Sequence, residues 1–269
     1  MPYLKLEDTT LFYTSQGTGP AILLLHGYAC DSHDWSFQIP YLLSRSYRVI
    51  ALDQRGHGRS STPDSPALYT PSHFAADIAA LLRHLQTGPV IVVGHSMGSV
   101  ITSVFAVEYP ELVRALVPVH TIYSGTPDAF EVMARKTEEE PDRSPEVVER
   151  FFAQVMYTPR TPEWLKTWQL RRVLSVEPPA LVGCIVGLVG VIGTVMGRSE
   201  TTKAFMRRRP SPRLAVCTTE AQAEWEREIG IGEGDEVHVL TEGTFSHVVQ
   251  SEKFNEILGN WLGKLKIEN

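Results

Sequence analysis

The segment Gly94-His-Ser-Met-Gly98 carries the residue types best suited to chemistry in this sequence. It directly follows the apolar run 90–93 and opens a segment of helical length, 97–109, that ends before Pro110. A serine on such a strand-to-helix turn is pushed above the edge of the sheet, and glycines flank it because side chains there would clash. The helix N-terminus also favours developing negative charge. The sequence therefore predicts Ser96 as a nucleophile for acyl transfer.

A second candidate segment, His26-Gly27-Tyr28, follows the apolar run 21–25. Acyl transfer needs two N–H donors aimed at the oxyanion, and losing one of them typically costs about 3 kcal/mol. The N–H groups of Tyr28 and Met97 are the predicted pair. Gly27 is assigned to the substrate-binding surface, and His26 is interpreted as a residue that orients this loop.

The elements that must position these segments are predicted to be strands and helices in regular alternation. Continuous apolar runs of strand length alternate with segments of helical length, and such runs are typical of strands buried on both faces of a parallel sheet. The pattern predicts an α/β fold with a doubly wound, mostly parallel sheet. The strand runs before residue 120 are 21–25, 47–52, 90–93 and 115–119, and the helical segments are 72–85 and 97–109.

This alternation of strands and helices stops after His120 for roughly ninety residues and resumes at Arg213. Prolines divide the interval into short helical pieces, so the sequence predicts an all-helical cap at 121–210, inserted into a core formed by 1–120 and 211–269. Within it, the stretch 180–197 carries no charge. A membrane span there would separate the strands before it from those after it, so we expect no stable membrane insertion.

The segment Asp53-Gln-Arg-Gly-His-Gly-Arg-Ser60 completes a set of three motifs. Together with the His-Gly turn and the Gly-His-Ser-Met-Gly turn, in this order, it resembles the α/β-hydrolase fold superfamily over residues 10–120 and again over 213–265. The resemblance implies the α/β-hydrolase fold, with its cap after the sixth strand and above the active site. It also implies a serine, an acid and a histidine in this chain order. Asp53, Arg55 and His57 look like scaffold residues.

The catalytic histidine implied by this order is His247. It follows the apolar segment 235–240 by a short loop with Gly243 and precedes the last amphipathic helix, predicted at 252–265. His247 is therefore expected at the same edge of the sheet as Ser96, as the base that takes the serine proton.

The acid is where this sequence departs from the family. An acid is expected just after the strand that follows the cap, in a glycine context, and this chain reads Cys217-Thr-Thr-Glu-Ala without the glycine. Glu220 is the predicted acid, and Asp128 at the start of the cap is the reserve candidate. Either residue is also consistent with a helix cap or a solvated surface position.

Ser96 with His247 predicts hydrolysis through an acyl-enzyme. The same fold uses aspartate at the elbow to open epoxides or remove halides, and a serine argues against both. The apolar cap, with Trp164 and Trp168 as expected substrate-binding residues, favours a hydrophobic ester, thioester or lactone. Two alternatives stay open: a serine-dependent carbon–carbon hydrolase, lyase or cyclase, and a ligand receptor.

The amino-acid composition excludes several other classes of protein. The chain has 269 residues, 25 Lys and Arg against 31 Asp and Glu, and a net charge of −6, which argues against a nucleic-acid-binding protein. Its three cysteines are far apart, so we expect neither a disulfide framework nor a cysteine metal site, and a cytoplasmic location is the default. No metal and no cofactor is predicted. A homodimer is compatible with the sequence.

Overall fold

An eight-stranded sheet forms the centre of the computed structural model, which describes residues 2–125, 128–210 and 212–265. The strands are β1 (Tyr3–Lys5), β2 (Thr10–Gln16), β3 (Ala21–Leu25), β4 (Arg48–Asp53), β5 (Val90–His95), β6 (Val113–Val119), β7 (Leu214–Cys217) and β8 (Glu236–Val239). Their order in the sheet is β1-β2-β4-β3-β5-β6-β7-β8. Only β1 and β2 pair antiparallel with their neighbours, and the pairs from β4 to β8 are parallel. The predicted mostly parallel sheet is confirmed.

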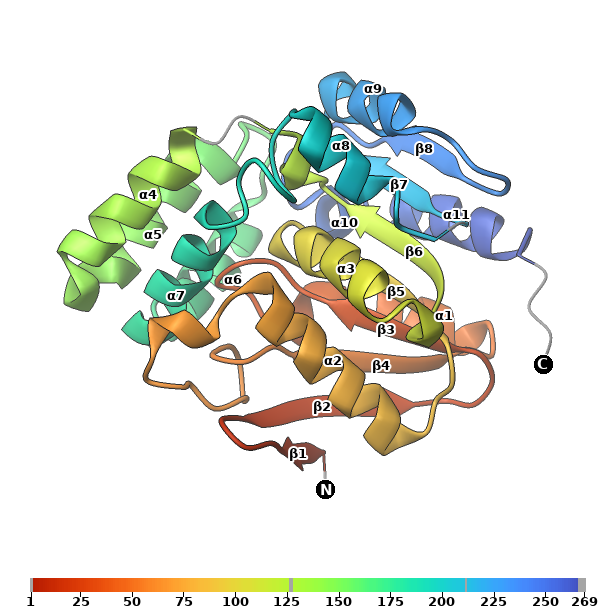
Figure 1. The fold of residues 1–269 in the computed structure, drawn as a ribbon, viewed down its shortest axis with the longest axis horizontal. Coiled ribbons are helices and arrows are strands. Elements are labelled where there is room, and N and C mark those ends of the chain that lie inside the picture. Colours follow the sequence, from red (N-terminus) through yellow and green to blue (C-terminus); the bar gives the residue numbers. More distant parts are fainter. Residues whose placement is uncertain (1, 126–127, 211, 266–269) are drawn as a thin grey trace.

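Helices cover both faces of this sheet (Figure 1). Ile22 and Leu24 of β3 pack with the side chains of α1 (Gln38–Ser44) and α11 (Ser251–Leu262). The alternate residues Leu23 and Leu25 pack with α2 (Pro71–Leu85) and α3 (Met97–Glu108). The helix α9 (Glu220–Ile229) covers β7 and β8 on this second face. Because both faces are covered, all five residues of β3 are buried, which explains why the strand is continuously apolar.

The insertion after β6 is helical, as predicted. Its main elements are α4 (Asp128–Glu139), α5 (Ser144–Phe151), the short helix η6 (Phe152–Met156), α6 (Glu163–Val173), α7 (Pro178–Val189) and α8 (Glu200–Met206). Among the described residues of 121–210, the only extended pairing is an isolated bridge between Ile192 and Met196. The helices α4 to α7 lie together at one end of the molecule (Figure 1), and we call this insertion the cap. Residues 126–127 of the cap and residue 211, the predicted start of the second core segment, lie outside the described residues.

The uncharged stretch 180–197 forms most of α7 and the turns after it. Most of the apolar side chains of α7 are buried in the protein interior, where they join the core on the α2 and α3 side of the sheet. In the described part of the chain, no single helix is long and apolar enough to cross a membrane. The helices α6 and α7 meet that length and composition only when taken together, and they are bent by 103° relative to each other.

Candidate active site

Ser96 lies on a sharp turn between β5 and α3. Its backbone has φ 54° and ψ −115°, a region that residues with side chains rarely adopt. The neighbouring glycines make the turn possible: a Cβ on Gly94 would lie 2.1 Å from Thr102 Oγ1, and one on Gly98 would lie 2.7 Å from the Leu25 carbonyl oxygen. The Ser96 N–H donates to the Val119 carbonyl at 2.9 Å, which ties the turn to β6. Ser96 thus sits at the carboxyl edge of the sheet and at the N-terminus of α3.

The loop after β3 runs directly against Ser96. A Cβ on Gly27 would lie 3.3 Å from Ser96 Cβ and 3.0 Å from His95 Nδ1, so a larger residue would be tightly packed there. Met97 is the first residue of α3, where the N–H has no partner within the helix. Within the described residues, no hydrogen bond uses the Tyr28 N–H. These two N–H groups therefore remain the predicted oxyanion hole.

Two buried histidines near Ser96 use both of their ring nitrogens in hydrogen bonds to loop backbone. His26 Nε2 accepts from the Gln54 N–H at 3.0 Å, and its Nδ1 lies 2.8 Å from the Gly27 carbonyl oxygen. His57 Nε2 accepts from the Ala29 N–H at 3.3 Å, and its Nδ1 lies 2.9 Å from the carbonyl of Arg55. Since each ring uses both nitrogens, neither is free to serve as a base, and the pair ties the loops after β3 and β4 together.

His247 lies in the short helix α10 (Ser246–Val249), and its ring packs among other rings. Its centroid is 4.2 Å from that of His95 and 4.8 Å from that of Trp35. The Gln38 side chain donates to the His247 carbonyl at 3.0 Å, which fixes the backbone. The side chain is fully buried, and neither ring nitrogen has a hydrogen-bond partner. The structure therefore places His247 against the residue that precedes Ser96, without a hydrogen bond between the two predicted catalytic side chains.

The surroundings of His247 favour the neutral ring. Burial lowers its pKa well below the ordinary value, and the nearby His95, His120 and Arg172 lower it further. A neutral imidazole is the form that accepts a proton from serine.

The two predicted acids do not reach His247, and this expectation needs correction. Glu220 is the first residue of α9, its side chain is 69% exposed, and its carboxylate pairs with Arg227 at 3.6 Å. Asp128 is the first residue of α4 and is exposed. Thr219 caps α9 by accepting from the Gln222 N–H, which turns the chain into a helix where a catalytic loop was expected.

A different carboxylate, that of Asp34, lies beside His247. Asp34 belongs to the short helix η1 (Ser32–Trp35), directly before Trp35. Potential ligand atoms of Asp34, His95 and His247 all lie within 4.8 Å of one another, and all three residues are buried. This trio is the group of described side chains that could hold a metal ion. In sequence, nothing links Asp34 with His247, because the two are more than two hundred positions apart.

The two tryptophans expected to bind substrate lie on the outer surface of α6. Trp164 and Trp168 are 42% and 38% exposed, and they contact each other edge to face at 4.8 Å. Trp164 also lies 6.5 Å from the ring of the exposed Phe37. Neither residue is buried near Ser96, so their contact with substrate stays a prediction.

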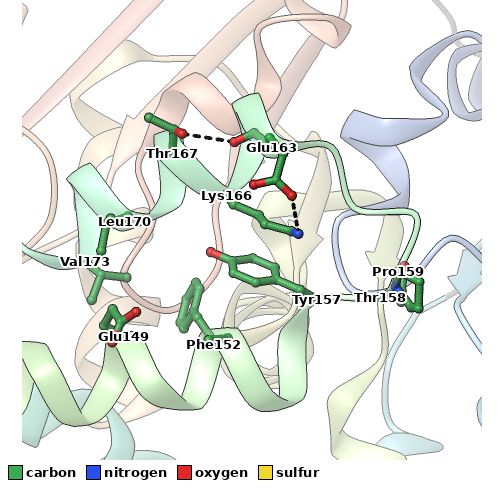
Figure 2. A pocket seen from close by; sticks show the side chains of 11 residues that line it. Glu149, Phe152, Tyr157, Thr158, Pro159, Glu163, Lys166, Thr167, Leu170 and Val173 are labelled. Carbon is green, nitrogen blue, oxygen red and sulfur yellow. Dashed lines mark hydrogen bonds and ion pairs between the residues drawn. The ribbon is translucent and has the colours of Figure 1, made fainter.

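The cap contains a hollow of about 540 Å³ between η6 and α6 (Figure 2). On its α6 wall, Lys166 pairs with Glu163 at 2.6 Å. Ser96 and His247 do not line the hollow. The ring of Phe152, which does line it, lies 6.2 Å from that of Phe245, and the Phe245 ring lies 5.4 Å from that of His95. The rings of Phe152 and Phe245 thus lie between the hollow and His95.

The family model of the alpha/beta hydrolase fold matches residues 20–183. This range is more than half of the chain and includes the segments around Gly27 and Ser96. The chain therefore belongs to the alpha/beta hydrolase fold family.

Relatives within this family carry several activities in their names. The chain is 42% identical over 114 residues to epoxide hydrolase 3 of Siraitia grosvenorii, which covers 42% of this chain and 36% of that protein. It is 43% identical over 99 residues to a non-heme haloperoxidase of Rhodococcus erythropolis, covering 36% of this chain and 35% of that protein. The matched segments span well under half the length of these curated relatives.

Solved structures show the fold over the whole chain. An enol-lactonase from Burkholderia xenovorans LB400 superposes with a TM-score of 0.83 at 19% identity, over 98% of this chain and 100% of that chain. A hydrolase from Pseudomonas aeruginosa gives 0.82 at 23% identity, over 97% of both chains. The fold is thus shared with these hydrolases over nearly the whole chain.

Proposed function

We propose that this protein is a serine hydrolase that cleaves a hydrophobic ester, thioester or lactone through an acyl-enzyme. The observation that carries the proposal is the strained turn of Ser96 at the N-terminus of α3. Such a turn presents Oγ to substrate, and the helix N-terminus stabilises the negative charge that develops on the attacked carbonyl.

The chemistry follows from the residues around the turn. Ser96 Oγ attacks the acyl carbon while His247 takes its proton, and the N–H groups of Tyr28 and Met97 bind the oxyanion. The acyl-enzyme forms as the alcohol or thiol leaves with that proton, and water then releases the acid. No hydrogen bond joins the His247 ring to Ser96 in the structure. We expect this bond to form when substrate binds, because catalytic hydrogen bonds often tighten only in the substrate complex.

Apolar surroundings support a hydrophobic acyl group. The Phe245 ring lies 5.4 Å from that of His95, and the Phe152 ring packs on Phe245 at 6.2 Å. Tyr28 donates its hydroxyl to the Leu181 carbonyl of the cap. Burial of apolar substrate surface would add about 25 cal/mol per Å² to binding. The relatives named epoxide hydrolase suggest a different reaction, and Ser96 favours acyl transfer over that reaction.

The test combines a fluorophosphonate probe with activated esters and lactones of increasing acyl length. Wild type should be labelled once, at Ser96, and should turn over the longer substrates better. Ser96→Ala should lose labelling and lower kcat by about 10⁴-fold or more. Ser103→Ala is the matched control, because Ser103 lies on the same helix and its hydroxyl binds the Ser99 carbonyl at 2.9 Å. Labelling that survives in Ser96→Ala would refute the proposal.

A further inference from the structure

The trio of Asp34, His95 and His247 contains several buried polar atoms without partners. Asp34 Oδ1 accepts from Arg172 and, at 3.2 Å, from the Gln169 side chain. Asp34 Oδ2, His95 Nδ1 and both nitrogens of His247 are buried and accept or donate no hydrogen bond. Buried polar groups in proteins are nearly always paired, so such a concentration calls for a specific explanation.

The hydrogen-bond inventory of the trio identifies what is missing. His95 Nε2 lies 2.8 Å from the Thr244 carbonyl oxygen, so this nitrogen carries the proton and His95 Nδ1 is an acceptor. Asp34 Oδ2 is an acceptor as well. A neutral His247 carries one N–H. It is the N–H of the trio that still lacks an acceptor, because the N–H of His95 already donates to Thr244. A carboxylate is the stronger acceptor, because charge-assisted hydrogen bonds are roughly twice as strong as neutral ones.

We infer that Asp34 is the carboxylate that orients His247, in the role expected of Glu220 or Asp128. This inference rests on the proposed function. Ligand atoms of the two residues already lie within 4.8 Å of each other, and the proposed contact shortens this separation to hydrogen-bond distance. One ring nitrogen of His247 then donates to Asp34 Oδ2, and the other is left as the acceptor for the Ser96 proton. Asp34 is in this sense a positioning residue, since it acts through His247.

The surroundings of Asp34 suit this role. Trp35, its neighbour in η1, packs its ring on His247 at 4.8 Å, so consecutive residues hold the imidazole from two directions. Arg172 and Gln169 of α6 hold the other carboxylate oxygen. The carboxylate is therefore paired with a cation that comes from the cap, which links the position of α6 to the orientation of the base.

A metal ion is the competing explanation for the same atoms. First-row metals bind histidine nitrogen at about 2.0–2.1 Å, so their ligand atoms must come closer to one another than the outer limit found here. The guanidinium of Arg172, already on Asp34, also repels a cation. These two points favour a proton over a metal between Asp34 and His247.

The charged and titratable groups that face His247 come from several elements. Asp34 belongs to η1, His95 ends β5, and His120 follows β6. Arg172 is contributed by α6. Replacing Asp34 removes the one negative charge among these groups, so it should lower the pKa of His247 further.

The experiment compares Asp34→Asn with Asp31→Asn as its matched control. Asp31 also pairs with Arg172, at 3.1 Å, but is not part of the histidine trio. Two readouts are measured: kcat and KM on an activated ester, and the tautomer and pKa of His247 from ¹H–¹⁵N spectra of its ring. The His247 signals are assigned by their absence in His247→Asn.

Asp34→Asn should lower kcat by about 10²-fold or more with KM within a few-fold, by analogy with the loss of a triad acid. It should also move the acid limb of the pH–rate profile and the His247 pKa to lower pH. Asp34→Glu should recover part of kcat, and Asp31→Asn should stay within a few-fold of wild type. If Asp34→Asn does not fold, Asp34→Asn with Arg172→Gln removes both charges and is tested in its place.

Three results would overturn the inference. The first is a kcat and a His247 pKa that are unchanged in Asp34→Asn. The second is an equal loss of kcat in Glu220→Gln. The third is stoichiometric Zn²⁺ binding that depends on Asp34 and shifts the His247 signals, which would make the trio a metal site. The spectra test the Asp34 contact even if Ser96 is not labelled by the probe, so failure of this inference and failure of the proposed function are distinguishable.

Discussion

Ser96 shows how one residue stores strain at this site. Its φ of 54° with ψ of −115° lies in a sparsely populated region for a residue with a Cβ, and such conformations cost of order 1–3 kcal/mol. The turn persists because β5 and α3 hold it on both sides, and because Gly94 and Gly98 have no Cβ that would clash with Thr102 and the Leu25 carbonyl. The strain is the cost of presenting Oγ at the edge of the sheet.

Removing that strain should stabilise the protein. We expect Ser96→Gly to have a free energy of unfolding about 1 kcal/mol higher than Ser96→Ala, because glycine adopts positive φ without a Cβ clash. Urea unfolding of the two variants measures the difference, and both lack the hydroxyl, so catalysis does not enter the comparison. A Ser96→Gly protein less stable than Ser96→Ala would mean that the turn is not strained.

At the scale of elements, α7 joins the cap to the core through glycines. A Cβ on Gly183 would lie 2.5 Å from the Tyr69 ring, and one on Gly187 would lie 2.4 Å from the Tyr69 carbonyl oxygen. The spacing of Gly183 and Gly187, which lie about one helical turn apart, thus allows close packing of α7 on the segment around Tyr69. The Tyr28 hydroxyl, which donates to the Leu181 carbonyl at 2.8 Å, adds a second link.

This packing predicts different effects for two glycines of the same segment. Gly187→Ala should lower the free energy of unfolding by about 1–3 kcal/mol, because its Cβ meets backbone atoms that cannot turn aside. Gly190 has φ −60°, and a Cβ there would lie 3.4 Å from the nearest atom, an ordinary contact. Gly190→Ala should therefore be neutral or stabilising by up to about 1 kcal/mol. Thermal and denaturant unfolding check both, and equal effects would contradict this packing.

Across the whole molecule, buried neutral histidines make stability depend on pH. Burial lowers the pKa of His57 and of His120 to about 3, and the pKa values of His95 and His247 are lowered as well. In the unfolded chain each titrates near 6.5. Between about pH 6.5 and pH 3 the unfolded state therefore binds more protons than the folded state, so stability falls as the pH falls.

The contribution of His57 to this pH dependence can be measured by comparing the free energy of unfolding of wild type with that of His57→Gln. His57→Gln should destabilise the protein at pH 7 by loss of its two hydrogen bonds, but the gap to wild type should shrink below pH 6.5 by up to about 1.4 kcal/mol per pH unit. Urea unfolding at pH 7, 6 and 5 measures this. Parallel curves for wild type and His57→Gln would contradict the shift.

The sequence by itself determined the class of fold and the nucleophile turn. Apolar runs such as 21–25 and 90–93 mark strands buried on both faces, and each is read from neighbouring residues only. The Gly94 to Gly98 turn is equally local, since strand, turn and helix follow one another in the chain. The helical cap after β6 could be predicted because its prolines and missing strands interrupt a regular pattern.

Only the tertiary structure decided which groups surround His247. Glu220 follows β7 in sequence, but Thr219 starts a helix there and directs the carboxylate to solvent and Arg227. Asp34 carries no local signal, and it approaches His247 because the loops after β3 and β8 end at the same edge of a parallel sheet. Such proximity depends on strand order and on the direction of each side chain, and neither is encoded in the spacing of residues along the chain.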